Sequence, residues 1–177
     1  MHRIVSLAAA IALASGAALA ASHTSGEMTA TMIDKDGNEV GTATFAMTAS
    51  GVVLVTAEVS GLEPGEHGFH IHETGEGDPA TEFESAGGHY AGEGDPKHGL
   101  VEGGPHAGDM PNQTVGKDGM LKAAVFNPNV SLSDGTNPLA DDDGSALLVH
   151  SGADDYESQP SGEAGGRVAC GVIEAAQ

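Results

Sequence analysis

The stretch His67-Gly68-Phe69-His70-Ile71-His72-Glu73 contains three of the nine histidines in this chain of 177 residues. Its apolar residues alternate with histidines, which is the period-two pattern of a β-strand. Side chains two positions apart on a strand point to the same face, so His70 and His72 present their imidazoles side by side. Two adjacent imidazole nitrogens form a ready pair of ligands for a transition metal. The stretch therefore predicts a metal-binding strand.

Five further candidate metal ligands follow this strand in the chain. They are His89, His98, His106, Asp109 and His150. Zinc prefers tetrahedral sites of nitrogen, sulfur and carboxylate oxygen, whereas copper takes several imidazoles and adds redox chemistry. Cys170 is the only cysteine, so an imidazole-rich site suits copper and zinc better than an iron–sulfur cluster or blue copper. These residues suffice for two metal sites, but their spacing leaves open which residue binds which metal.

Residues 1–20 have the pattern of a secretory signal peptide. Arg3 supplies the positive start, an apolar run follows, and Ala18-Leu19-Ala20 is a small-x-small cleavage site. The run is short and rich in Ala, which argues against a membrane-spanning helix. We therefore expect cleavage after Ala20 and a periplasmic or secreted protein. It would have a flexible tail over residues 21–26 and a single domain over residues 27–177.

The composition is strongly acidic, with 26 Asp and Glu residues against six Lys and Arg residues and a formal net charge of −20. Nucleic acids and anionic membranes are themselves polyanions, so the charge argues against both as partners. A lone cysteine excludes a disulfide within the chain. Its apolar neighbours indicate that Cys170 is a small buried hydrophobe.

Short runs rich in Val and Thr, separated by Gly-containing turns, predict an all-β fold. Besides the histidine strand, the expected strands span residues 28–33, 40–48, 52–59, 120–126, 146–150 and 167–173. The segment 75–115 is rich in Gly, Pro and acidic residues and lacks sustained periodicity, and residues 151–166 form a second polar loop. Loops of this length inside a compact domain are usually functional. Many short strands with glycine-rich turns are typical of a sandwich or barrel.

Six motifs in this order resemble the copper,zinc superoxide dismutases, and most closely their secreted bacterial branch. The motifs are Gly68-Phe69-His70-Ile71-His72-Glu73, Ser85-Ala86-Gly87-Gly88-His89, Lys97-His98-Gly99, Gly104-Pro105-His106-Ala107-Gly108-Asp109, Leu148-Val149-His150 and Gly166-Arg167-Val168-Ala169-Cys170-Gly171-Val172-Ile173. The similarity extends from about residue 28 to residue 174, which is nearly the whole chain after the signal segment. The resemblance implies a flattened Greek-key barrel of about eight antiparallel strands with two long functional loops.

The resemblance also implies a role for each candidate residue. The family's copper ligands correspond to His70, His72, His89 and His150, and its zinc ligands to His89, His98, His106 and Asp109. His89 would bridge the two metals. Asp154 resembles the aspartate that fixes the rings of His70 and His98, and His67 resembles a structural histidine that bonds to the backbone.

The implied activity is disproportionation of the superoxide anion to oxygen and hydrogen peroxide. The cofactors would be a copper ion, cycling between Cu(II) and Cu(I), and a structural zinc ion. His89 would carry a proton, and Arg167 would attract the anionic substrate. Arg167 is the only arginine after Arg3; the alternative is an ordinary arginine paired with one of many carboxylates. A homodimer is possible, and a metal carrier with little turnover on the same scaffold is the alternative function.

Three features depart from the family's pattern or add to it. The family's usual disulfide partner for Cys170 is absent, and Gly77 or Phe83 stands where it would be. The segment 151–166 has acidic residues but no lysine, so we expect poor long-range steering of superoxide. Finally, cleavage after Ala20 would expose Ala21-Ser22-His23, whose amine, amides and imidazole suit a weak accessory copper or nickel site.

Overall fold

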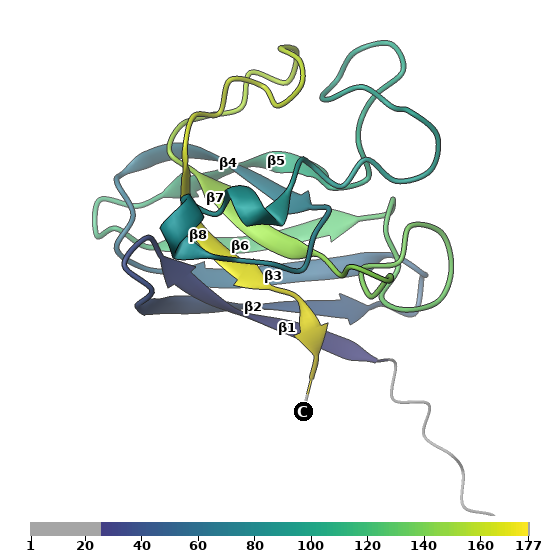
Figure 1. Cartoon of the computed structure of the whole chain (residues 1–177), viewed down its shortest axis with the longest axis horizontal. Helices are drawn as coiled ribbons and strands as arrows, with labels where there is room; N and C mark the ends of the chain where they lie inside the picture. Colours follow the sequence, from purple (N-terminus) through teal and green to yellow (C-terminus); the bar gives the residue numbers. More distant parts are fainter. Residues whose placement is uncertain (1–25, 177) are drawn as a thin grey trace, which may run out of the picture.

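The computed structural model describes residues 26–176 and consists almost entirely of strands (Figure 1). The strands are β1 (Glu27–Asp34), β2 (Glu39–Met47), β3 (Val53–Val59), β4 (Gly65–His72), β5 (Asp109–Val115), β6 (Leu121–Asn127), β7 (Ala146–His150), β8 (Arg167–Val172) and β9 (Glu174–Ala175). Two 3-10 turns, η1 (Pro79–Thr81) and η2 (Glu84–Ala86), interrupt the segment after β4. The predicted signal peptide, its predicted cleavage site and the Ala21-Ser22-His23 segment lie outside the described residues.

The strands close into an antiparallel barrel. Their order is β2-β3-β6-β5-β4-β7-β8-β1, and β1 also pairs with β2, which joins the two ends of the sheet. β4, β5 and β6 follow one another both in the chain and in the sheet. The chain also brings β6 beside β3, and β7 beside β4. These are two overlapping Greek keys. The predicted fold class is confirmed, with the two-residue β9 added at one edge.

The seven strands expected from the sequence are all present, with ends that differ by one or two residues. One prediction was wrong, because the segment 75–115 is not a loop throughout. Its last seven residues, Asp109-Met110-Pro111-Asn112-Gln113-Thr114-Val115, form β5. Only Met110 and Val115 in this strand are buried, so the sequence carries no alternating pattern that would reveal it.

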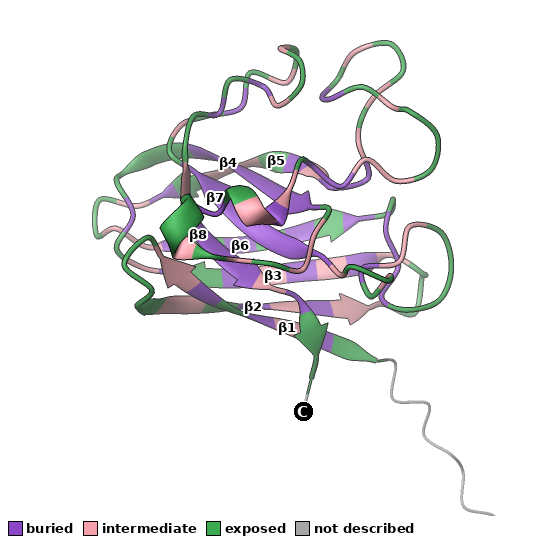
Figure 2. Ribbon diagram, in the orientation of Figure 1, coloured by how far each residue is buried: buried purple, intermediate pink, exposed green. Residues whose placement is uncertain are grey.

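The barrel core explains why the histidine strand has two faces. Phe69 and Ile71 are fully buried in the main hydrophobic cluster, together with residues such as Phe45 and Leu121. His70 and His72 alternate with them and therefore project from the outer face of β4. They are nevertheless buried as well, and Figure 2 shows β4 and β7 buried along most of their length. The long loops must therefore cover this wall of the barrel.

A second, smaller hydrophobic cluster attaches the loop after β4 to the outer face of β7 and β8. Phe83 and Ala86 from the loop pack against Ala146, Leu148 and Cys170 from the strands. Cys170 is completely buried, as its neighbours in the sequence predicted. This apolar contact holds the loop beside the histidines.

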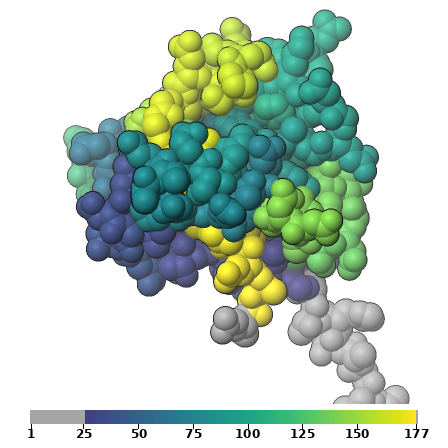
Figure 3. Space-filling model, viewed as in Figure 1, coloured from purple at the N-terminus to yellow at the C-terminus, as the bar shows by residue number. Residues whose placement is uncertain are grey.

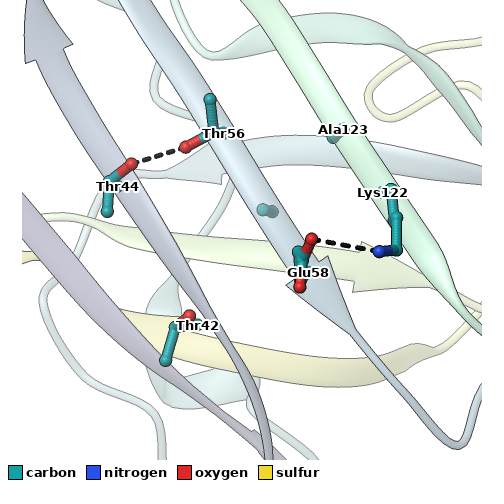
Figure 4. A pocket seen from close by; sticks show the side chains of 7 residues that line it. Thr42, Thr44, Thr56, Glu58, Lys122 and Ala123 are labelled. Carbon is teal, nitrogen blue, oxygen red and sulfur yellow. Dashed lines mark hydrogen bonds and ion pairs between the residues drawn. The ribbon is translucent and has the colours of Figure 1, made fainter.

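The opposite wall of the barrel carries no histidine chemistry. A shallow groove of about 410 Å³ lies on the outer face of β2, β3 and β6. Figure 4 shows the hydrogen bond between Thr44 and Thr56 and the exposed ion pair between Glu58 and Lys122 in this groove. None of its lining residues is a metal ligand. Among residues 26–176, no helix is long and apolar enough to cross a membrane.

Candidate metal centre

Strand pairing brings the first three imidazoles together. In the register between β4 and β7, His70 lies opposite Leu148 and His72 lies opposite Ala146. His150 ends β7, on the same face as Leu148, so its ring meets those of the β4 histidines. Nε2 of His72 and Nε2 of His150 lie 3.3 Å apart.

Backbone pairing also positions His89, although it comes from a loop. An isolated antiparallel bridge joins His89 to His72. The amide of Tyr90 donates to the carbonyl of Ile71 over 2.8 Å, and the amide of Ile71 donates to the carbonyl of Gly108 over 3.0 Å. Through these bonds the backbone of β4 also pairs with residues of the loop. The His89 ring consequently lies 4.0 Å from the His70 ring, measured between their centroids.

The first group of potential ligands consists entirely of imidazoles. His70, His72, His89 and His150 each offer one nitrogen, and these four atoms lie within 4.8 Å of one another. Nδ1 of His70 and Nε2 of His89 are buried and have no hydrogen-bond partner among the described residues. Buried polar atoms without a partner cost free energy. A cation that accepts their lone pairs removes this cost, so the group fits a metal ion and its donor set suits copper.

The second group is centred on one carboxylate oxygen. Oδ1 of Asp109 lies 2.9 Å from Nδ1 of His89, 3.1 Å from Nδ1 of His98 and 3.4 Å from Nδ1 of His106. Ligands about 2.0 Å from a tetrahedral zinc ion are about 3.3 Å from one another. The other oxygen, Oδ2, accepts the amide hydrogens of Gly99 and His106. This group therefore fits a zinc ion.

His89 belongs to both groups. Its Nδ1 faces Asp109, while its Nε2 is directed away from Asp109 and lies among the imidazoles of the first group. A single imidazole thus lies between two adjacent groups of potential metal ligands. The residues of the two ligand sets that the resemblance implied lie together in these two groups.

One buried carboxylate, that of Asp154, bonds a histidine in each of the two groups. Oδ2 of Asp154 accepts a hydrogen bond from Nε2 of His70 over 2.8 Å, and Oδ1 accepts one from Nε2 of His98 over 3.0 Å. Both histidines therefore bond Asp154 through Nε2, which leaves Nδ1 directed toward the groups of potential ligands. A carboxylate behind a ligating histidine fixes its tautomer and orientation. Asp154 has the contacts that the sequence predicted.

Residues 39–173 match the family model of copper/zinc superoxide dismutase. The chain belongs to the copper/zinc superoxide dismutase family. A dismutase of this family from Aquifex aeolicus is 48% identical over 147 residues, which cover 81% of this chain and 84% of that protein. The dismutase of Escherichia coli K12 is 38% identical over 146 residues, which cover 78% and 80% respectively.

Solved structures agree with this assignment. A double mutant of a superoxide dismutase-like protein from Bacillus subtilis superposes with a TM-score of 0.76 at 37% identity, covering 81% of this chain and 94% of that one. The Cu/Zn superoxide dismutase from Brucella abortus gives a TM-score of 0.67 at 32% identity, covering 84% and 99%.

Burial shapes the electrostatics of this dismutase-family site. Desolvation lowers the pKa of His89 to about 4 and that of His150 to about 3. Burial opposes ionisation of Asp154, but the hydrogen bonds from His70, the amide of Tyr156 and His98 together outweigh it, and the pKa falls to about 2. The pKa of Asp109 is lowered for the same reason, by its histidine contacts. Neutral His89 and His150 and ionised Asp109 and Asp154 are in the protonation states that metal binding requires. By contrast, the hydrogen bonds to Asp109 and Asp154 raise the pKa of His98 against the effect of burial.

Arg167 lines a pocket beside the first group, and this pocket is called the channel below. The channel of about 310 Å³ is bordered by His72, His89, His150 and Arg167. The guanidinium of Arg167 donates hydrogen bonds to the carbonyls of Phe83 and Gly87. Two carbonyls thus hold the guanidinium beside the imidazoles, where the sequence placed it.

Some residues of the site were not predicted from the sequence. The side chain of Gln159 bonds both the amide and the carbonyl of His98, and the hydroxyl of Tyr156 accepts from the amide of Asn112. These bonds tie the segment 151–166 to the loop that contains His98 and to β5, and Figure 3 shows the segment and this loop side by side. Only the side-chain chemistry of Gln and Tyr hinted at this role. His67 bonds the carbonyls of His150 and Glu63, as expected of a structural histidine.

Proposed function

We propose that this protein is an exported superoxide dismutase that uses one copper and one zinc ion per chain. Copper would be held by His70, His72, His89 and His150, and zinc by His89, His98, His106 and Asp109. The observation that carries the proposal is the position of His89, whose two ring nitrogens face the two groups. A protein that only carries one metal has no need for two cation sites that share a ring.

The substrate would be the superoxide anion, as the names of the relatives state for those proteins. When bound, copper supplies the one-electron redox chemistry that converts superoxide into oxygen and hydrogen peroxide. Arg167 supplies the positive charge and unused N–H donors that attract and orient an anion beside the imidazoles. Nε2 of His89, buried and without a partner among the described residues, is the atom that would take up a proton and pass it on.

The zinc-side residues would serve structure. His98, His106 and Asp109 come from the loop after β4 and from the start of β5. A cation bound between them would join three parts of a segment that has little regular structure. Asp154 would keep His70 and His98 aligned for both metals at once.

The proposal includes the fate of the N-terminal segment. Residues 1–20 would be a cleaved signal peptide, residues 21–26 a tail, and residues 27–177 the dismutase domain. The mature protein would act in the periplasm or outside the cell. N-terminal sequencing of protein recovered from the periplasmic fraction tests the cleavage site, and a mature chain that still contains residues before Ala21 would contradict it.

The activity is tested on protein loaded with both metals. We expect one copper and one zinc ion per chain by elemental analysis, rapid consumption of superoxide, and a loss of roughly tenfold or more in Arg167→Ala because the anion loses its cationic partner. Arg167→Lys should retain part of the rate because it keeps the charge. A metal carrier would show negligible turnover and no response to either substitution.

A further inference from the structure

The channel that leads to the first imidazole group contains one acidic side chain besides its one basic side chain. Its charged lining residues, other than histidines, are Glu84 and Arg167. Oε2 of Glu84 lies 3.6 Å from a terminal nitrogen of Arg167. The site that attracts an anion is therefore already in contact with an anion of the chain itself.

The geometry at Arg167 makes this contact a competing one. Its two terminal nitrogens donate to the carbonyls of Phe83 and Gly87, which fix the plane of the guanidinium. The N–H groups that remain are those that an incoming anion would use. Glu84 approaches the same terminal nitrogen that bonds Gly87. A small anion that binds there must share Arg167 with the carboxylate or displace it.

Glu84 is held only weakly. Its side chain is 73% exposed, and this ion pair is the only polar contact that the described residues give it. Exposed ion pairs contribute little to stability, so displacement of the carboxylate is easy. The backbone of Glu84 is fixed independently, because its carbonyl accepts the amide of Gly87 at the end of η2. The side chain can therefore change without loss of the local fold.

We propose that Glu84 is a specificity-determining residue, a tethered anion that competes with small anions for Arg167 and sets the affinity of the channel for them. The inference rests on the proposed function in naming superoxide as the anion concerned. In a chain with a formal net charge of −20, this carboxylate neutralises the one fixed cation of the channel. The channel then discriminates against weakly binding anions, and superoxide capture is slower than Arg167 alone would allow.

The test uses the copper- and zinc-loaded protein, with azide as the probe anion and the copper absorption spectrum as the readout. We expect Glu84→Gln to bind azide about twofold to fivefold more tightly at low ionic strength, which is the range that an exposed ion pair supports. The rate with superoxide should rise by a similar factor, and both gains should shrink as salt screens the charges. Glu84→Asp, whose shorter side chain keeps the charge but draws it away from Arg167, should give a smaller gain.

The matched control is Glu39→Gln, which removes the same charge from the exposed start of β2, across the barrel from β4. It should leave azide affinity nearly unchanged. If Glu84→Gln and Glu39→Gln have the same azide affinity and the same rate, the inference is wrong. If the wild-type protein consumes no superoxide while azide affinity still responds to Glu84→Gln, the proposed function fails and the competition at Arg167 stands.

Discussion

Gly77 faces Cys170 so closely that a Cβ atom on Gly77 would lie 3.0 Å from Sγ of Cys170 and 3.9 Å from its Cβ. The second distance is within the usual range between the Cβ atoms of a disulfide, about 3.5–4.5 Å. Of the two positions that the sequence offered for the missing partner, Gly77 therefore has the right geometry. Phe83 instead fills the small hydrophobic cluster around Cys170.

Gly77→Cys should consequently form a disulfide with Cys170 under oxidising conditions. The bond would close a loop of about ninety residues, and we expect it to raise the free energy of unfolding by about 2–4 kcal/mol. Chemical unfolding of the oxidised and reduced variant measures the gain, and Gly77→Ser serves as a control that cannot cross-link. An oxidised form no more stable than the reduced form would contradict the geometry.

Removal of the metals should lower the melting temperature by an unusually large amount. In this chain the loop after β4 is attached to the barrel by the apolar contacts of Phe83 and Ala86 and by hydrogen bonds, without a disulfide. The metal sites would therefore supply much of its attachment, because ligand binding adds directly to the stability of the folded state. Calorimetry of metal-loaded and metal-free protein measures the difference. Similar melting curves would show that the loop does not depend on metal.

The rate with superoxide should stay flat or rise as salt increases. Enzymes that steer an anionic substrate with positive fields slow down when salt screens those fields. Here the loop from Ser151 to Gly166 has no lysine, and Arg167 is paired with Glu84. Initial rates between 10 and 300 mM of an inert salt test this expectation, and a steep fall would refute it.

Gly162→Ala should disrupt the carboxylate behind both sites. Gly162 has a φ of +69°, and a Cβ there would overlap Oδ1 of Asp154 and lie 2.6 Å from Nε2 of His98. We expect zinc affinity to fall about tenfold to a hundredfold, as is typical when the support of a ligating histidine is lost. Gly103→Ala is the matched control, since Gly103 has a φ of +89° but open space around it. Equal affinities in the two variants would rule out the role assigned to Asp154.

Metal-free protein should lose stability as pH falls below about 6.5. Burial lowers the pKa of His89 to about 4 and that of His150 to about 3. The unfolded chain therefore binds protons in this interval that the folded chain does not, which favours unfolding. His89 alone would account for a loss on the order of 3 kcal/mol by pH 4. Urea unfolding at pH 7.5, 6 and 4.5 measures the slope, and a constant or rising stability would contradict these shifts.

The sequence indicated which candidate ligands lie together better than it indicated the contacts around them. His70 and His72 stand out because strand periodicity places both on one face, and the motif around His89 is specific. The sequence did not predict the strand β5, because only two of its residues, Met110 and Val115, are buried and they do not form an alternating pattern. The contact between Glu84 and Arg167 and the bonds of Gln159 to His98 join residues 61 or more positions apart. Such contacts depend on how loops fold over the barrel, which local patterns do not encode.

Because the barrel is closed by strand pairing, we expect its strands to stay paired even when the metals are removed. Because β1 pairs with both β2 and β8, the sheet closes on itself and leaves fewer free strand edges that a neighbouring molecule could extend. We therefore expect the loops over the imidazoles to loosen in metal-free protein, while the barrel resists edge-to-edge polymerisation. Adding the metals back after chelation should then recover the original folded protein, because little of it would have aggregated.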